Sequence, residues 1–267
     1  MKRLKFSFLT ILVASSSVFA AQNNTKHLED TNPFDENAKP NIMTEPSGLV
    51  SYSFKKNSNS IVNIDPDRGY LFEAQQTKMF GRVHTHPSRV TNLKSEIQDR
   101  ISLQAERKEN FKKRQLKTGL VSIESAELMF DKTMQGKLPS LTHILPSLKP
   151  AVTYGGGNYI TNKGWDTSVS IIRNKQLGNI IIELWNYEAT NGGVILDSDA
   201  VNISIMGNPG VFIVRTAGDN SESVLSWADE KSAYTIRSDA DLGSGELKSK
   251  LIELADLITI ENSNGEY

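Results

Sequence analysis

Residues 208–236 read NPGVFIVRTAGDNSESVLSWADEKSAYTI, and this stretch decides the predicted fold. Residues 211–214 and 223–227 are rich in β-branched and aromatic side chains, which favour strands. Gly-Asp-Asn at 218–220 has the composition of a turn between them. A third short strand, Tyr234-Thr235-Ile236, follows the turn at residues 228–232. The pattern predicts antiparallel strands joined by short connections.

The upstream sequence continues this pattern. Strand-like runs occupy residues 168–172, 179–185 and 201–205. Turn clusters rich in Gly and Asn separate them at residues 191–193 and 207–210. We therefore expect an antiparallel meander.

A helix is predicted downstream of these strands. Ser244 is its expected cap, and a single apolar stripe follows, made of Leu247, Leu251, Leu254, Ala255 and Ile258. This stripe is expected to pack on the sheet. The sequence thus predicts an α+β domain over residues 150–260 and a flexible tail over residues 261–267.

Two features inside this domain are predicted to lie in loops. Gly155-Gly156-Gly157-Asn158 is interpreted as a flexible loop, because the Lys-Ser/Thr of a nucleotide-binding loop does not follow the glycines. Trp165, which follows Lys163-Gly164, is expected in a loop where it contacts a ligand. Trp185 and Trp227 lie in strand runs and are expected in the core.

Residues 78–149 form a predicted basic helical segment. Eleven basic and four acidic side chains within residues 78–117 give that stretch a net charge of +7. A repeat of one apolar residue every four predicts a long amphipathic helix over about residues 92–117, carried by Leu93, Ile97, Ile101 and Ala105. Thr91 is its expected N-cap, and Gly119 is expected just beyond its end.

A second, shorter helix is predicted in the same segment. It is expected over about residues 124–134 and to end at Gly136. Leu128 and Met129 are expected on its buried face.

The first twenty residues have the pattern of a secretory signal peptide. Lys2, Arg3 and Lys5 precede an apolar run, and small residues lead to Ala20, after which we expect cleavage. The mature protein is therefore expected in the periplasm or outside the cell. Residues 21–77 are rich in Asn, Ser, Pro and charge, and we expect a mostly irregular lead-in with one short edge strand near Tyr52.

Composition excludes several classes of protein. The chain has 267 residues, of which 38% are hydrophobic, and it has no Cys, so a wholly disordered chain, a disulfide scaffold and a Cys nucleophile are excluded. No G-x-S-x-G motif marks a Ser nucleophile. Beyond the leader, no apolar stretch is long enough to span a bilayer, so we expect a soluble mature chain without a transmembrane span.

Charge is distributed unequally along the chain. The whole chain has a net charge of −1, but residues 181–267 carry fifteen acidic and five basic side chains, a net charge of −10. The basic helix is expected to lie against this acidic region, to meet an acidic partner, or to form a solvated face. Nucleic acid is not an expected partner, because the protein is exported and Phe111 is the helix's only interleaved aromatic residue.

Four segments carry a resemblance to a known family. They are Asn208-Pro209-Gly210-Val211 and the stretches VLSWAD (224–229), AYTI (233–236) and LIELADLI (251–258). This order resembles the extracytoplasmic domain of bacterial anti-sigma-linked proteins and of relatives of the outer-membrane lipoprotein sorting and sigma-E regulatory family. The resemblance covers about the last 60 residues and implies a binding or sensing module without catalytic residues. Unlike many members, this chain has no lipid-attachment Cys and no predicted transmembrane anchor.

Val83-His84-Thr85-His86-Pro87 is the stretch most suggestive of chemistry. Two His at i and i+2 on an extended segment point the same way, and both imidazoles can bind one Zn²⁺. His-Thr-His-Pro is similar to the centre of the JAMM-type zinc isopeptidases. By this resemblance, Asp99 of this chain would be the third zinc ligand.

The spacing around this motif departs from that family. Eight residues separate His86 from Ser95 and three separate Ser95 from Asp99, and each gap is one residue longer than the family pattern. Nothing in the spacing selects an upstream acid between Glu45 and Glu73. The favoured interpretation is that His84 and His86 are surface residues. His27 and His143 are likewise interpreted as ordinary core or surface residues.

The combined pattern favours an exported binding or sensing protein without a cofactor, which recognises another envelope or secreted protein or a small ligand. The alternatives are a zinc-dependent hydrolase using His84 and His86, and a secreted inhibitor or immunity-type protein. Expected contact residues are Trp165 and the basic side chains Arg107, Lys108, Lys112, Lys113 and Arg114.

Overall fold

The computed structural model describes residues 68–119, 121–133, 150–190 and 192–264, and the backbone alone of residues 41–44 and 50–53. The predicted signal peptide, His27, Glu45, Gly136 and His143 lie outside the described residues.

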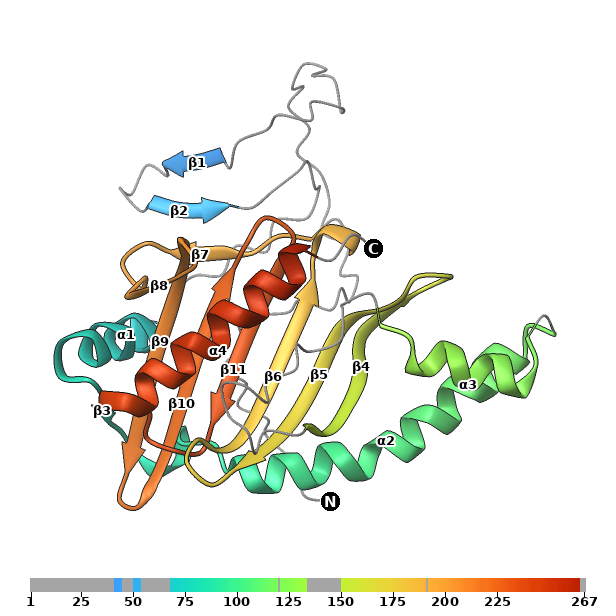
Figure 1. The fold of residues 1–267 in the computed structure, drawn as a ribbon, viewed down its shortest axis with the longest axis horizontal. Helices are drawn as coiled ribbons and strands as arrows, with labels where there is room; N and C mark the ends of the chain where they lie inside the picture. The colour runs from blue at the N-terminus through green and yellow to red at the C-terminus, as the bar shows by residue number, and fades with distance from the viewer. Residues whose placement is uncertain are drawn as a thin grey trace, which may run out of the picture.

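A large antiparallel sheet forms the centre of the structure (Figure 1). Its six long strands lie in the order β4-β5-β6-β11-β10-β9, and every neighbouring pair is antiparallel. In chain order they are β4 (Pro150–Ile160), β5 (Gly164–Asn174), β6 (Gly178–Asn186), β9 (Asn208–Ala217), β10 (Asn220–Ala228) and β11 (Ser232–Ser238).

Short strands complete the sheets. Along the outer edge of β9, β3 (Val83–His84) pairs in parallel and β8 (Ile203–Ile205) pairs antiparallel. A separate antiparallel sheet contains β1 (Asn41–Thr44), β2 (Val50–Ser53) and β7 (Ile195–Asp197). In the described part of the chain, single-turn 3-10 helices occupy Pro87–Arg89 and Glu188–Thr190.

Helix α4 (Gly245–Asn264) covers one face of the large sheet (Figure 1). Leu251, Leu254 and Ile258 are buried against the sheet residues Leu225 and Trp227. Burial of apolar surface is the main stabilising term in such a layer. The predicted α+β class, and the terminal helix packed on the sheet through this stripe, are confirmed.

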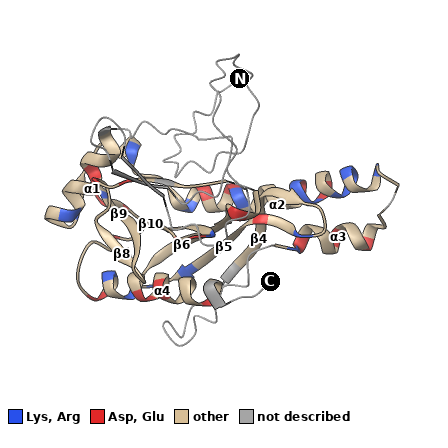
Figure 2. Cartoon of the chain, turned by 90° about the horizontal axis from the view of Figure 1, so that it is seen from above, with Lys and Arg blue, Asp and Glu red and all other residues tan. Residues whose placement is uncertain are grey.

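Helices α1 (Arg68–Phe80) and α2 (Leu93–Leu116) lie on the opposite face, so the sheet is the middle of three layers (Figure 2). Ala74 of α1 packs with Val211 and Ile213 of β9. Leu93 and Ile97 of α2 pack with Val169, Ile171 and Ile181. Helix α3 (Ile123–Asp131) lies beside the far half of α2, where both extend beyond β4 (Figure 2).

Charged side chains connect these two helices to the sheet. Arg215 of β9 forms ion pairs with Glu73 of α1 at 2.9 Å and Glu222 of β10 at 3.1 Å, and all three side chains are buried. Arg237 of β11 links Glu222 at 3.1 Å to Glu96 of α2 at 2.8 Å. Because these buried charges are paired, the helices are positioned by specific contacts as well as by apolar packing.

A second ion-paired contact holds α2 nearer the middle of the sheet. Arg100 bridges Glu96 at 2.8 Å and Glu183 of β6 at 2.6 Å. Arginines and carboxylates therefore alternate across β9, β10, β11 and β6 beneath the helices.

Strand order differs from the predicted meander. After β6 the chain passes through β7 and β8 to the far edge, and β9, β10 and β11 then return so that β11 pairs with β6. The local patterns correctly indicated antiparallel strands, but pairing of β6 with β11 depends on contacts between distant segments.

The helical boundaries also differ in places. Most of helix α1, residues 68–77, lies within the range predicted to be mostly irregular. The sequence did not indicate this helix, because its burial depends on the sheet and its own apolar periodicity is weak. Asn92, not Thr91, caps α2 by accepting from the Ser95 backbone N–H at 3.0 Å. Helix α4 continues to Asn264, through the start of the predicted tail.

The buried face of α3 matches the prediction only in part. Ala126 and Phe130 are buried, Met129 is partly buried, and Leu128 is 74% exposed. The helix turns Phe130 toward Phe111 of α2, which selects the face that is covered. Within the described residues, no helix is both long and apolar enough to cross a membrane.

Candidate ligand-binding site

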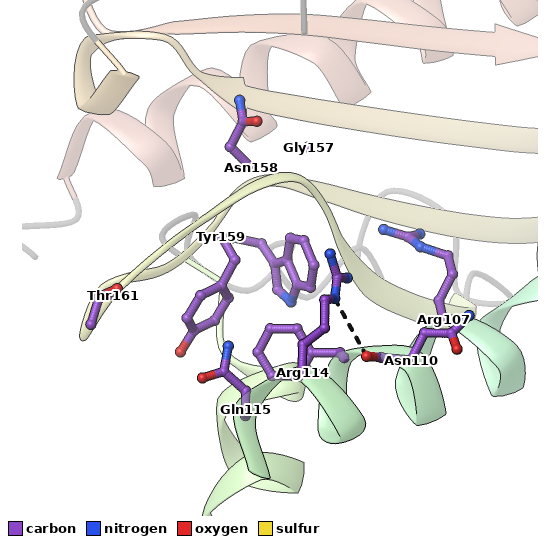
Figure 3. A pocket seen from close by; sticks show the side chains of 10 residues that line it. Arg107, Asn110, Arg114, Gln115, Gly157, Asn158, Tyr159 and Thr161 are labelled. Carbon is purple, nitrogen blue, oxygen red and sulfur yellow. Dashed lines mark hydrogen bonds between the residues drawn. The ribbon is translucent and has the colours of Figure 1, made fainter. Parts of the chain in front are cut away.

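A pocket of about 540 Å³ lies between the far half of α2 and the hairpin of β4 and β5 (Figure 3). We call it the hairpin pocket. Small-molecule sites commonly have volumes of about 300–1,000 Å³. The lining residues are Arg107, Asn110, Phe111, Arg114, Gln115, Gly157, Asn158, Tyr159, Thr161 and Trp165.

The helical side of the pocket is one stripe of α2. Its lining residues are spaced at i, i+3, i+4, i+7 and i+8, which places them on a single helix face: Arg107, Asn110, Phe111, Arg114 and Gln115. Phe111 is buried at the middle of this stripe, and an arginine lies one turn away on each side of it. The face is therefore apolar at its centre and cationic at both ends.

An aromatic cluster forms the floor of the pocket. The Trp165 ring lies 5.5 Å from Phe111, 5.8 Å from Phe130 and 5.4 Å from Tyr159, measured between ring centroids. The Trp165 indole Nε1–H donates to the Phe130 carbonyl oxygen at 2.8 Å. Such edge-to-face ring contacts stabilise a rigid wall.

Trp165 lies in strand β5 and is 6% exposed, so the prediction that it lies in a loop was wrong. The glycine run opposite explains its position. A side chain at Gly155 would overlap the indole ring, so the absence of a Cβ there admits the tryptophan. Residues 155–158 are accordingly part of strand β4, which corrects the predicted flexible loop.

A bulge in β4 shapes the hairpin side of the pocket. The strand register shifts between Gly156 and Tyr159. Asp166, which is fully buried, accepts hydrogen bonds from the Asn158 backbone N–H at 2.9 Å and from the Thr167 hydroxyl at 3.0 Å. The bulge is thus tied to β5 by a buried carboxylate. From this hairpin Tyr159 extends toward Gln115 of α2 (Figure 3).

The two arginines of the pocket form no ion pair with a carboxylate of the described chain. Arg107 is half-buried; its guanidinium lies 5.7 Å from the Trp165 ring centroid and contacts the Gly155 carbonyl oxygen at 3.4 Å. Burial lowers the pKa of Arg107, as does the nearby positive charge of Arg100, while Tyr154 opposes this shift. Arg114 is exposed and donates from Nε to the Asn110 carbonyl oxygen at 3.4 Å (Figure 3).

The predicted basic contact residues divide into two groups. Arg107 and Arg114 line the pocket, as does Trp165. Lys108 pairs with Asp131 at 3.4 Å, and Lys112 pairs with Glu127 at 2.8 Å, so both hold α3 against α2. Lys113 is exposed and does not line the pocket. A role in ligand contact stays a prediction for all of them.

The two predicted metal ligands lie at the opposite edge of the sheet. His84 of β3 contacts the Thr216 hydroxyl through Nδ1 at 2.8 Å, and His86 contacts the Ser88 hydroxyl through Nδ1 at 2.8 Å. Among the described residues, no three His, Asp or Glu side chains gather as a metal site, so the structure does not bring Asp99 to them as a third ligand. Glu73, a nominated acid, is instead paired with Arg215.

Several pocket residues were not predicted from sequence. Tyr159, Asn110, Gln115 and Thr161 belong to no motif, and their common property is proximity in the fold. The i, i+7 spacing of Arg107 and Arg114 was a usable signal, since it places both on one helix face. The location of the hairpin opposite that face had no local signal.

Comparisons with protein-family models, with curated proteins and with solved structures found no match for this chain. The pocket is therefore interpreted from its own chemistry.

Proposed function

We propose that this protein is an exported, non-catalytic binding protein whose recognition site is the hairpin pocket. The observation that carries the proposal is the composition of that pocket: two arginines that pair with no carboxylate of the described residues, two side-chain amides on α2 and a rigid aromatic floor. These groups orient and hold a ligand. Among the described residues that line the pocket, Tyr159 and Thr161 carry hydroxyl groups, but none is a His, Asp, Glu, Ser or Cys that could activate a water or a nucleophile.

The resemblance to extracytoplasmic binding and sensing domains supports the same proposal. Some of the residues that carry it pack together on the α4 side of the sheet: the Trp227 and Tyr234 rings are stacked at 4.9 Å, and Trp227 Nε1–H donates to the Thr259 hydroxyl at 2.9 Å. Others, such as Val211 and Ala233, are buried on the opposite face. In this proposal they form the scaffold, and the pocket on the other side of the sheet supplies recognition.

Export is part of the proposal and has its own test. The leader pattern predicts that mature protein recovered from an envelope fraction begins at Ala21. Intact-mass measurement of that protein checks the cleavage point. Recovery of uncleaved chain only from the cytoplasm contradicts export.

Ligand binding is tested by thermal shift against a panel of small anionic, neutral and cationic compounds. The expected result is a rise in Tm of the wild type with at least one compound, and loss of that rise in Tyr159→Ala. A rise that persists in Tyr159→Ala places binding elsewhere and contradicts the proposed site. Ala at this half-buried position leaves the buried rings Phe111 and Trp165 in place.

Metal analysis separates this proposal from the hydrolase alternative. We expect the purified protein to carry no stoichiometric zinc. About one Zn²⁺ per chain, lost in a His84→Ala, His86→Ala variant together with hydrolytic activity, contradicts a non-catalytic role.

A further inference from the structure

We infer that the hairpin pocket binds a small molecule that carries an anionic group, a carboxylate or a phosphate, on a planar ring. This inference rests on the proposed function, because it specifies the ligand of the same pocket.

The charge of the pocket points to an anion. Among the described residues that line it, the ionisable groups are the guanidinium groups of Arg107 and Arg114 and the Tyr159 hydroxyl. Two neighbouring lysines on α2 are paired with carboxylates, Lys108 with Asp131 and Lys112 with Glu127, whereas no carboxylate of the described residues pairs with either arginine. An anion entering the pocket would supply the missing counter-charge in a partly desolvated site.

The position of the arginines suits recognition of an oxyanion. They lie seven residues apart on α2, about 10 Å along its axis, with Asn110 between them. Figure 3 shows both side chains extending from α2 toward the hairpin. A guanidinium presents several N–H donors in one plane, which matches the paired oxygens of a carboxylate or phosphate.

The aromatic side chains of the pocket are the reason to expect a planar ring in the ligand. Tyr159 is half-buried and extends across the pocket, beside the Trp165 and Phe111 rings that form the floor. The Trp165 indole N–H already bonds the Phe130 carbonyl, so the floor offers no free donor, and because Phe111 and Trp165 are buried, Tyr159 provides most of the ring surface open to a ligand. Flat apolar surface beside cations favours a ligand with a ring next to its charge.

The volume limits the size of the ligand. A pocket of about 540 Å³ accommodates one small molecule without movement of the α2 or β4 backbone.

Isothermal titration calorimetry at low salt tests the inference with four probes: phenyl phosphate, benzoate, inorganic phosphate and phenol. We expect phenyl phosphate or benzoate to bind the wild type at least about tenfold more tightly than either inorganic phosphate or phenol, because only the aromatic anions use both parts of the pocket. We expect the affinity to fall as salt is raised.

Arg114→Gln is the decisive variant, and Lys113→Gln is its matched control. Both positions are exposed on α2, but only Arg114 lines the pocket. We expect Arg114→Gln to weaken binding of the aromatic anion by about tenfold, the usual effect of losing a charge-assisted hydrogen bond, and Lys113→Gln to leave it unchanged. Equal weakening in both variants would indicate general attraction to the basic helix and overturn the inference.

Other outcomes distinguish this inference from the proposed function. If phenol binds as tightly as the aromatic anions and Tyr159→Ala abolishes its binding, the pocket is a recognition site but the anionic ligand is wrong. If inorganic phosphate binds as tightly as phenyl phosphate, the inference that the ligand carries a planar ring is wrong. If no aromatic anion binds at millimolar concentration, the inference fails, while the thermal-shift panel still tests the pocket with other compounds.

Discussion

At Gly157 the backbone of β4 turns into the left-handed region, with a φ of 69°. This residue lies at the bulge, directly against Asp166. A Cβ here would overlap the Asp166 carboxylate, which holds the bulge through Asn158. Gly157 therefore has two requirements that other residues do not meet, a positive φ and empty space beside a buried charge.

Gly157→Ala is expected to destabilise the protein by about 3 kcal/mol, because it adds overlap with a buried carboxylate to the cost of the left-handed backbone. Urea unfolding followed by circular dichroism measures the loss. Gly218→Ala is the matched control, because Gly218 has a φ of 60° but no atom within 4 Å of a Cβ built there. It is expected to cost about 1 kcal/mol. Equal losses in the two variants would contradict a role for the Asp166 contact.

Helix α2 combines two functions along its length. Its first turns are held to the sheet by Leu93, Ile97 and the ion pair of Glu96 with Arg237. Its later turns extend beyond that contact and carry the pocket stripe from Arg107 to Gln115. The anchored half therefore positions the pocket half relative to the β4–β5 hairpin.

The pKa of Glu96 lies below its usual range. Burial alone would raise it, but hydrogen bonds and charge from Arg237 and Arg100 outweigh burial and lower it. A carboxyl with a depressed pKa in the folded state stabilises the protein above the unfolded pKa, about 4.3 for Glu, and this contribution is lost as the pH falls through the folded value.

Glu96→Gln is therefore expected to lower the free energy of unfolding by about 2 kcal/mol at pH 7, since it leaves Arg237 and Arg100 with one carboxylate partner each. The difference between wild type and variant is expected to shrink as the pH falls below about 4. Denaturant titrations between pH 7 and pH 3 measure both effects. Glu106→Gln, at an exposed position on the same helix, is the control. It is expected to change neither the free energy of unfolding at pH 7 nor its dependence on pH. A difference that is constant with pH contradicts the assigned ion pairs.

The whole molecule depends on covering both faces of the sheet. Helix α4 covers one face with Leu251, Leu254 and Ile258. Helices α1 and α2 cover the other, where Val211, Ile213 and Ile181 are buried beneath them. Although the sequence suggests a separate domain over residues 150–260, the sheet has apolar side chains on both sides and uses helices from before residue 150.

A fragment of residues 150–264 is accordingly expected to fail to fold as a monomer, because removal of α1 and α2 exposes one complete apolar face and leaves Arg215 without Glu73 and Arg237 without Glu96. A fragment of residues 68–264 is expected to unfold in one cooperative transition. Size-exclusion chromatography and thermal unfolding compare the two. A monomeric, cooperatively folded 150–264 fragment would contradict this view of the molecule.

Several parts of the fold were predictable from local pattern. The apolar repeat from Leu93 to Ile101 predicted α2 to within a residue or two, and the stripe from Leu247 to Ile258 predicted which face of α4 is buried. Burial of Trp185 and Trp227 was also correctly predicted. These features depend on residues close together in the chain, where backbone geometry links spacing directly to a face.

The candidate site was predictable only in part. The sequence indicated Trp165 and the basic residues Arg107 and Arg114 as contact residues, but it placed Trp165 in a loop and gave no reason to separate Arg114 from Lys112. That separation depends on Glu127 of α3, which pairs with Lys112 and has no counterpart at Arg114. The glycines at 155 and 157 suggested flexibility, whereas they make room for Trp165 and Asp166.

By itself, the sequence determined the kinds of elements and the faces that they bury, because hydrophobic periodicity acts over a few residues. Tertiary structure alone decided that β11 pairs with β6, that α1 forms on the sheet, and that Tyr159 and Trp165 meet Phe111 and the two arginines of α2 in one pocket. The physical reason is that these arrangements depend on shape and charge matching between segments far apart in the chain, and no local pattern records which segments will become neighbours.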